Sequence, residues 1–238
     1  MLLYEYTMPS GARIVGYLRD PDDHMPDYKV RPGVLIIPGG GYDHCGHREG
    51  DPVAMNFLNA GYQVFILTYT TANTTPAPLG FAPLRDAAGA ILHLRRNAAA
   101  LNLDPHRLAV CGFSAGGHLA TSVALLAHRP EVCADLGAEA SQLRPDAVIL
   151  GYPVITSGDF AHKGSIANLA GNDRSLWELF SLEKQVQPGM PPFFLWHTVE
   201  DDVVPVQNTL LLVGALQACH VPYELHLFPH GAHGSSTC

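Results

Sequence analysis

The chain has 238 residues, of which 47% are hydrophobic and 15% are charged. This composition is typical of a globular protein, and the length fits one α/β domain better than two. Acidic residues outnumber Lys and Arg by 22 to 14, and no run of basic residues occurs. The formal net charge of −8 argues against nucleic acid or an anionic membrane as the main partner. We therefore expect a single domain over residues 1–238.

Short apolar runs alternate with helical patterns along the chain. The apolar runs predict strands at 13–19, 34–37, 62–67, 107–111, 147–150, 192–196 and 223–228. The helical patterns predict helices at 51–59, 84–101, 115–127 and 206–218. Strands that are apolar on both faces suit a parallel sheet, and strand–helix alternation places helices on both faces. The fold class is therefore α/β, with a mostly parallel central sheet.

Two stretches do not fit this alternation. Residues 70–83 are rich in Thr, Pro and Ala and predict an irregular loop. Residues 155–189 separate two predicted strands and are too long for a simple connection, with a short helix expected at 176–182. In α/β enzymes an insertion of this kind lies over the carboxyl ends of the strands, where ligands bind. We expect a small cap at about 155–190; a surface excursion without a role is the alternative.

The strongest motif is the segment 112–118, which reads G-F-S-A-G-G-H. It contains G-x-S-x-G between a predicted strand and a predicted helix, which is the context that a nucleophile turn requires. Ser114 would project from a strained turn, with the amino end of a helix beside it. Gly112 and Gly116 would let the strand and the helix approach closely, because they carry no Cβ atom. This pattern predicts that Ser114 is a nucleophile.

A glycine run, Gly39-Gly40-Gly41, follows the apolar strand at 34–37. Backbone N–H groups in such a loop can turn toward a developing negative charge. A phosphate-binding loop is the rival interpretation, but no Lys-Ser/Thr follows and no G-x-G-x-x-G pattern is present. A tight turn without a role is the other alternative.

Six segments together resemble the α/β-hydrolases of the esterase and lipase group, close to small bacterial acetyl-xylan-esterase-like carboxylesterases. They are residues 37–42, the region of Tyr69, and residues 104–107, 112–118, 201–205 and 231–234. The resemblance implies the α/β-hydrolase fold. It also implies an oxyanion hole made by Gly40, Gly41 and Ala115, although Pro38 stands where the family usually has His. Tyr42 and Tyr69 are expected in the substrate pocket.

Thirteen histidines compete for the role of base. In the α/β-hydrolase order, the acid and then the histidine follow the serine. His233 lies just past the last predicted strand in a Gly-Ala-His-Gly sequence that resembles the family pattern. His230 precedes it by three residues, and His118 lies one helical turn after Ser114. We predict His233 as the base and interpret His118 as a packed helix residue.

The acid is expected on the loop after the strand at 192–196. Asp201 stands four residues before Pro205, as in the family, with Glu200 and Asp202 as rivals. Asp202 also suits the start of the next helix. We predict Asp201 as the acid that orients the base.

No metal or cofactor is expected. The densest His and Cys clusters are 44–47 and the group His226, His230 and His233, and neither has the ligand spacing of a zinc site. The expected function is a serine carboxylesterase that hydrolyses short acyl esters, acetyl esters of small alcohols or sugars among them, through an acyl-enzyme. An amide, formamide or peptide hydrolase of the same fold is one alternative, and a ligand-binding protein without catalysis is another.

The amino end, Met1-Leu-Leu-Tyr-Glu5, has no basic region before its short apolar run. It does not predict a signal peptide, and no apolar stretch is long enough to span a bilayer. Five cysteines without regular spacing predict free thiols in a reducing compartment. We expect a cytoplasmic protein; a mature fragment of a secreted precursor is the alternative.

Only five residues follow His233, so the last helix usual in this fold is not expected. That helix would cover part of the sheet and anchor the histidine loop. Three explanations are open: a truncated chain, a partner subunit such as a second copy covering the bare sheet face, or a histidine loop that is poorly ordered on its own.

Overall fold

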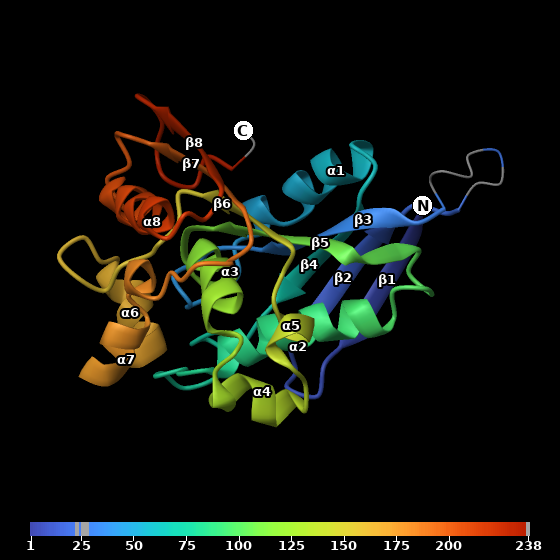
Figure 1. Ribbon diagram of the computed structural model, residues 1–238, viewed down its shortest axis with the longest axis horizontal. Coiled ribbons are helices and arrows are strands. Elements are labelled where there is room, and N and C mark those ends of the chain that lie inside the picture. The colour runs from blue at the N-terminus through green and yellow to red at the C-terminus, as the bar shows by residue number, and fades with distance from the viewer. Residues whose placement is uncertain (22–23, 25–28, 237–238) are drawn as a thin grey trace.

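The computed structural model describes residues 1–21, 24 and 29–236, and Cys238 lies outside them. Eight strands form one sheet in the order β1-β2-β4-β3-β5-β6-β7-β8 (Figure 1). The strands are β1 (Leu2–Thr7), β2 (Arg13–Leu18), β3 (Arg31–Ile37), β4 (Gln63–Thr68), β5 (Leu103–Phe113), β6 (Ala147–Gly151), β7 (Phe193–Thr198) and β8 (Tyr223–Phe228). In this spatial order, each strand from β4 to β8 pairs in parallel with the next one. Strand β2 pairs antiparallel with both β1 and β4. The predicted sheet is therefore correct.

The strands that were predicted carry continuous buried runs, of which Val34 to Ile37 in β3 is fully buried. β1 was not predicted because Leu2 and Leu3 are more than half exposed. This edge strand is ordered by its pairing with β2 and has no buried face of its own to give a periodic signal.

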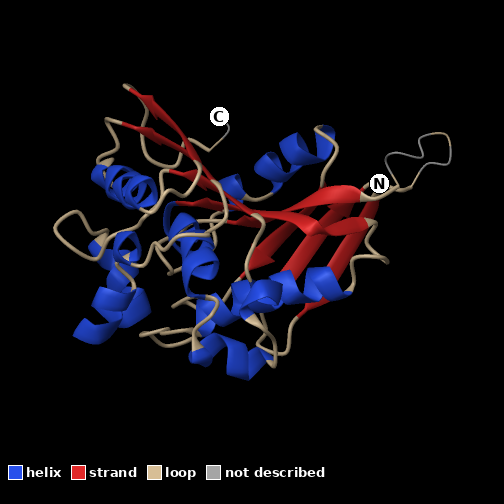
Figure 2. Cartoon of the chain, viewed as in Figure 1, coloured by secondary structure: helices blue, strands red, loops and turns tan. Residues whose placement is uncertain are grey.

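Helices cover both faces of the sheet, as expected (Figure 2). α1 (Asp51–Asn59) packs on one face, in a core with residues of β3 and β4. α2 (Ala82–Arg96), α3 (Ser114–Leu126) and α8 (Gln207–Ala218) share the core of the other face. Every residue of α3 is buried, which makes it the central helix.

Two short helices, α4 (Pro130–Leu136) and α5 (Ala140–Leu143), were not predicted. The predicted helix at 84–101 was too long. It ends at Arg96, because Asn97 leaves the helical conformation and its side chain donates to the His93 carbonyl oxygen at 2.8 Å.

The segment expected to form a cap folds into α6 (Lys163–Ala170), α7 (Arg174–Leu179) and the short helix η3 (Leu182–Lys184). Its side chains in the core include Ile166, Leu169, Phe180 and Leu182. The Asn168 amide donates to the Gly41 carbonyl oxygen at 3.0 Å. The segment therefore lies directly against the glycine loop that follows β3.

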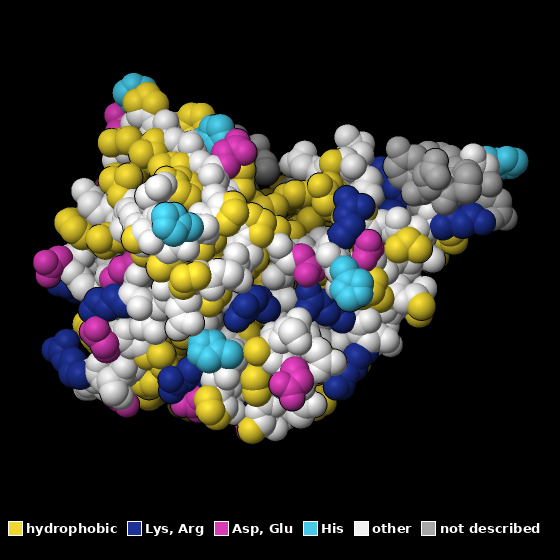
Figure 3. Space-filling view, viewed as in Figure 1, with side chains coloured by type: hydrophobic (Ala, Val, Ile, Leu, Met, Phe, Trp, Pro, Cys, Tyr) yellow, Lys and Arg dark blue, Asp and Glu magenta, His cyan; other side chains and the backbone are white. Residues whose placement is uncertain are grey.

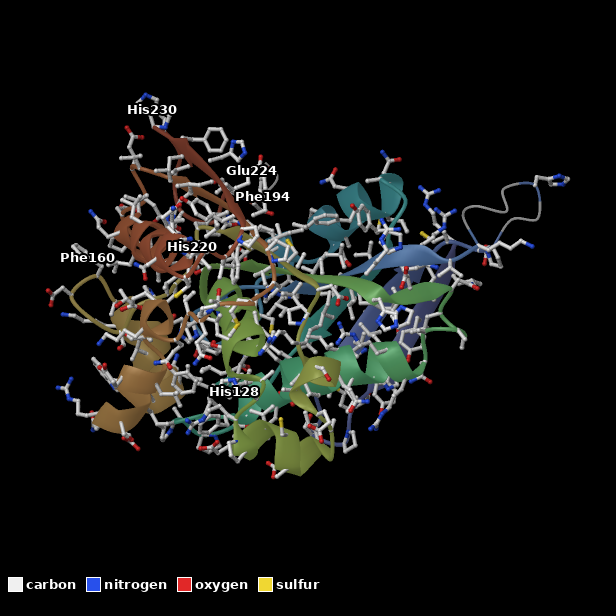
Figure 4. All side chains as sticks on the ribbon, in the orientation of Figure 1. His128, Phe160, Phe194, His220, Glu224 and His230 are labelled. Atoms are coloured by element: carbon white, nitrogen blue, oxygen red, sulfur yellow. The ribbon has the colours of Figure 1, made fainter. Side chains whose placement is uncertain are left out.

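The described residues after β8, 229–236, form turns rather than a helix. On the face of β7 and β8 opposite α8, Phe194 is 36% exposed and Phe228 is 49% exposed. Phe194 lies beside its register partner Glu224 on this face (Figure 4). Hydrophobic side chains also line the hollow between this part of the sheet and α1 (Figure 3). These apolar side chains of β7 and β8 are therefore partly exposed in the described part of the chain.

Candidate active site

Ser114 occupies a strained turn between β5 and α3. Its φ is +52°, a left-handed conformation that costs a non-glycine residue of order 1 kcal/mol or more. A Cβ atom at Gly112 would lie 2.4 Å from the Gly116 carbonyl oxygen, and one at Gly116 would lie 2.1 Å from that of Ile37. The two glycines therefore allow strand, turn and helix to meet, as the motif predicted.

His233 joins Ser114 to Asp201. Its Nε2 lies 2.9 Å from the Ser114 Oγ, and its Nδ1 lies 2.7 Å from Oδ2 of Asp201. Since a carboxylate only accepts, Nδ1–H donates to Asp201, and Nε2 accepts the serine proton. The three predicted residues are brought together in the geometry that activates a serine hydroxyl. The described part of the histidine loop places His233 within hydrogen-bond reach of Ser114 in the single chain.

The Asp201 carboxylate is fully buried and hydrogen-bonded through both oxygens. Oδ1 accepts the N–H groups of Val203 and Val204 at 3.0 and 2.8 Å. Burial acts to raise the pKa of Asp201, but the bonds from His197, His233 and Val204 outweigh it and hold this pKa well below its usual range. Asp202, the rival acid, is exposed.

A second histidine also contacts Asp201. His197, at the end of β7, is fully buried, and its Nε2 lies 3.2 Å from the same Oδ2 that His233 contacts. The Val204 carbonyl oxygen lies 3.0 Å from this Nε2, so Nε2 carries the proton and donates. We did not predict this residue. Its spacing, four residues before Asp201 at a strand end, was the available signal.

The rival bases lie elsewhere. His118 is fully buried in α3, where its Nε2–H donates to the Phe180 carbonyl oxygen at 3.0 Å and its Nδ1 accepts from the Tyr42 hydroxyl at 2.8 Å. Burial lowers the pKa of His118 to about 4. The His230 side chain is 80% exposed at the tip of the molecule and pairs with Glu200 (Figure 4). Neither imidazole is bonded to Ser114.

Three side chains hold the glycine loop at 38–41. The Tyr69 hydroxyl donates to the Pro38 carbonyl oxygen at 2.8 Å, and Glu49 accepts the Gly39 N–H at 2.6 Å. The third is Asn168, described above. These contacts orient the loop although Pro38 replaces the histidine that the family usually has.

Gly40 and Gly41 have φ values of +120° and +67° and line the cavity at Ser114. A Cβ atom at Gly40 would lie 2.2 Å from the His44 carbonyl oxygen, so this position requires glycine. Ala115 is buried in the first turn of α3, where backbone N–H groups have no partner within the helix. The predicted oxyanion residues therefore surround the nucleophile.

The cavity at Ser114 has a volume of about 590 Å³. Tyr42 and Tyr69 do not line it, so the prediction of both as pocket residues is wrong for this cavity. Both rings are buried in the core, because their hydroxyls reach internal partners, His118 and the Pro38 carbonyl oxygen. Tyr69 lines a separate cavity on the other side of the loop at 44–47.

His162, from the cap segment, also lines the Ser114 cavity and was not predicted. Its Nδ1 accepts the Ser165 backbone N–H, so the proton resides on Nε2. Burial, with the nearby His233 as a smaller cause, lowers the pKa of His162. It is therefore a neutral hydrogen-bond donor at neutral pH, and a lone histidine in an insertion gives no sequence signal for this.

Within the described ranges, no three His, Cys, Asp or Glu side chains converge in a way that could hold a metal ion. The four cysteines inside these ranges, Cys45, Cys111, Cys133 and Cys219, are free thiols. No helix in this part of the chain is both long and apolar enough to cross a bilayer.

A mostly parallel sheet, a strained serine turn after β5, and an acid and a histidine on the loops after β7 and β8 define an α/β-hydrolase. The family model described as BD-FAE matches residues 24–216, and the chain belongs to this family.

The chain is similar to several known proteins. Endo-1,4-beta-xylanase B of Butyrivibrio fibrisolvens is 44% identical over 89% of the chain and 33% of its own length. The acetylxylan esterase of Xylanibacter ruminicola is 26% identical over 88% of the chain and 42% of its own length. The chain thus spans less than half of either relative. The structure of an acetyl ester-xyloside bifunctional hydrolase from Caldicellulosiruptor lactoaceticus has a TM-score of 0.82 and 38% identity, covering 96% of this chain and 81% of that one.

Proposed function

We propose that this protein is a serine carboxylesterase that hydrolyses short acyl esters of small polar alcohols. The observation that carries the proposal is the continuous chain of contacts from Ser114 through His233 to Asp201. The His233 imidazole takes the Ser114 proton as Oγ attacks the ester carbonyl carbon. Asp201 holds the imidazole in the required tautomer and stabilises its protonated form.

The tetrahedral intermediate carries its negative charge on the former carbonyl oxygen. The N–H groups of Gly40, Gly41 and Ala115 stabilise this oxygen, and the loss of one such donor raises the barrier by roughly 3–4 kcal/mol. His233 then returns its proton to the departing alcohol, leaving an ester on Ser114. Water, deprotonated by His233, attacks this ester and releases the carboxylic acid.

The walls of the cavity support a polar substrate. Arg48, His47 and His162 line it, and Val203 is its one branched apolar side chain among the described residues. A long acyl chain would need an extended apolar wall to bury its methylene groups. The names of the relatives support acetyl groups carried on sugar hydroxyls as the substrate class.

Hydrolysis of p-nitrophenyl acetate, butyrate and octanoate, an acetylated xylose and an acetanilide tests this proposal. We expect acetyl esters to be hydrolysed fastest and Ser114→Ala to lose roughly 10⁴–10⁶-fold in kcat. Ser10→Ala changes an exposed serine that is far from Ser114 in the sequence, and its kcat should match that of the wild type. Equal rates for Ser114→Ala and the wild type would contradict the assignment, and a preference for the amide would redirect the substrate class.

A further inference from the structure

Glu49 is a buried carboxylate outside the triad. It is 5% exposed and ends the short helix η2 (His47–Glu49). A buried carboxylate is costly unless hydrogen bonds replace its water. Its Oε2 accepts the Gly39 N–H at 2.6 Å, and its Oε1 accepts the Tyr152 hydroxyl proton at 2.8 Å. One side chain therefore joins the loop at Gly39 to the loop at Tyr152, which lies 103 residues beyond Glu49 along the chain.

The first of these loops carries the oxyanion glycines. Gly39 directly precedes Gly40 and packs against the nucleophile, since a Cβ atom at Gly39 would lie 2.8 Å from the Ser114 Cβ. It would also lie 2.8 Å from the Phe113 carbonyl oxygen. The bond from the Gly39 N–H to Glu49 therefore fixes the start of the oxyanion loop at its contact with the serine turn.

The second loop, after β6, presents Tyr152 to the histidine. The Tyr152 ring is 1% exposed and packs edge-on against the His233 imidazole, with 4.9 Å between centroids and 68° between planes. Its hydroxyl oxygen accepts the Ser236 N–H at 3.0 Å. Burial, and then the Glu49 charge, raise the pKa of Tyr152, so its hydroxyl keeps the proton that it donates to Glu49.

We propose that Glu49 and Tyr152 form a clamp that sets the placement of the oxyanion glycines relative to the base. Both are positioning residues: Glu49 acts through Gly39, and Tyr152 acts through His233. The inference rests on the proposed esterase function, because it concerns how the oxyanion N–H donors and the His233 base are placed around the carbonyl group of one ester substrate. Glu49 also lines the Ser114 cavity, whereas Tyr152 does not, so the loss of the Tyr152 hydroxyl is the change whose effect should fall on kcat rather than on KM.

Two substitutions test the clamp. In Glu49→Gln, a single amide oxygen cannot accept both the Gly39 N–H and the Tyr152 O–H. In Tyr152→Phe, the ring against His233 remains while the hydroxyl is lost. A displacement of about 1 Å at a reacting centre costs about 10²-fold in rate. We expect each variant to lose about 10–100-fold in kcat, with KM within about 3-fold for Tyr152→Phe, and the double variant to lose little more in kcat than either single one.

Kinetics are measured per active site, counted by titration with a fluorophosphonate, so that unfolded protein does not enter kcat. Tyr17 and Asp51 supply a chemically matched control, because the Tyr17 hydroxyl donates to an exposed Asp51 carboxylate at 2.7 Å. Tyr17→Phe and Asp51→Asn should keep the wild-type kcat. Variants of the clamp that only melt at a lower temperature, or that raise KM at an unchanged kcat, would overturn the inference.

The rate of Ser114 labelling by the fluorophosphonate separates this inference from the proposed function. If the wild type is labelled but hydrolyses no ester, the function fails, and slower labelling of both clamp variants still supports the clamp. Equal labelling rates for the wild type and both variants overturn the clamp alone. A wild type that is neither labelled nor active overturns both.

Discussion

At the scale of single residues, the surroundings of a side chain decide its chemical role, as the two histidines His233 and His118 show. His233 stands 16% exposed at the cavity, bonded to a buried carboxylate, whereas His118 is fully enclosed by neutral partners. An enclosed imidazole without a counter-charge resists protonation. His233 is therefore suited to exchange protons with the serine, whereas His118 packs and forms hydrogen bonds within the core.

The enclosure of His118 makes stability depend on pH. The unfolded chain binds a proton at this position near pH 6.5, but the folded protein does so only near pH 4. Stability is therefore full above pH 6.5 and falls as the pH drops from 6.5 to 4, by about 3 kcal/mol from this residue. Urea unfolding at pH 7 and 4.5 should show a smaller fall for His118→Asn. His128→Asn, at an exposed histidine (Figure 4), should follow the wild type, and parallel curves for all three proteins would contradict the prediction.

Asp201 and Asp202 form an adjacent pair that differs in surroundings. Asp201→Asn should lower kcat about 10⁴-fold, because the amide cannot keep the His233 tautomer in place. Asp202→Asn should leave kcat within about 2-fold, since its side chain is exposed and does not line the Ser114 cavity. The depressed pKa of Asp201 means that its stabilising charge is present above pH 4 and is lost only at lower pH. Steady-state kinetics of both variants check the assignment.

The sequence allowed some site residues to be predicted and not others, for a physical reason. Ser114 could be selected because turn glycines between a strand and a helix constrain it locally, and Asp201 and His233 because the segments after the last strands resemble the family pattern. Glu49 and Tyr152 could not, because their bond joins positions 103 residues apart. Polar pairs of this kind depend on the completed packing of several loops, which no local spacing encodes.

At the scale of elements, β3, β5 and α3 can approach one another closely only because glycines without side chains stand where they meet. A methyl group at Gly116 would collide with backbone oxygens of Ile37 and Pro38, which cannot move without shifting the oxyanion loop. Gly116→Ala should therefore lower the free energy of unfolding by about 3 kcal/mol. Gly214→Ala, in α8, has open space around it and should raise the stability by about 0.5–1 kcal/mol. Similar urea midpoints for the two variants would contradict this account.

The predicted elements were correct where burial gives a periodic pattern. β8 and α1 were predicted with their observed bounds, and the other strands within a few residues. β1 and α6 were missed because one is an exposed edge strand and the other contains Gly164 near its start. Both are stabilised by neighbours rather than by their own sequence.

At the scale of the molecule, the order of the sheet spreads the site along the chain. The glycine loop, the nucleophile, the acid and the base follow β3, β5, β7 and β8 respectively. The strands β7 and β8, which carry the acid and the base, are the last in the chain and lie at one end of the sheet. Contacts between distant segments form slowly, because loop closure precedes any gain from pairing. In refolding from urea, we expect far-ultraviolet circular dichroism to recover before fluorophosphonate labelling of Ser114. Simultaneous recovery of the two signals would contradict this expectation.

The bare face of β7 and β8 bears on assembly. A homo-oligomer remains a prediction, and light scattering across a range of protein concentrations would test it. Edge strands with exposed apolar side chains also favour unwanted pairing, so the exposed Phe228 of β8 is the first position to change if the protein aggregates.

The spacing of the site along the chain has a consequence during synthesis. The ribosome delivers Ser114 and the glycine loop long before His233, which lies 119 residues beyond the serine. A nascent chain can therefore build its serine turn while the hydroxyl still has no base to activate it. Reactivity toward esters begins only when the histidine loop arrives, so the growing polypeptide is protected from acylation until β8 and the loop after it have been synthesised.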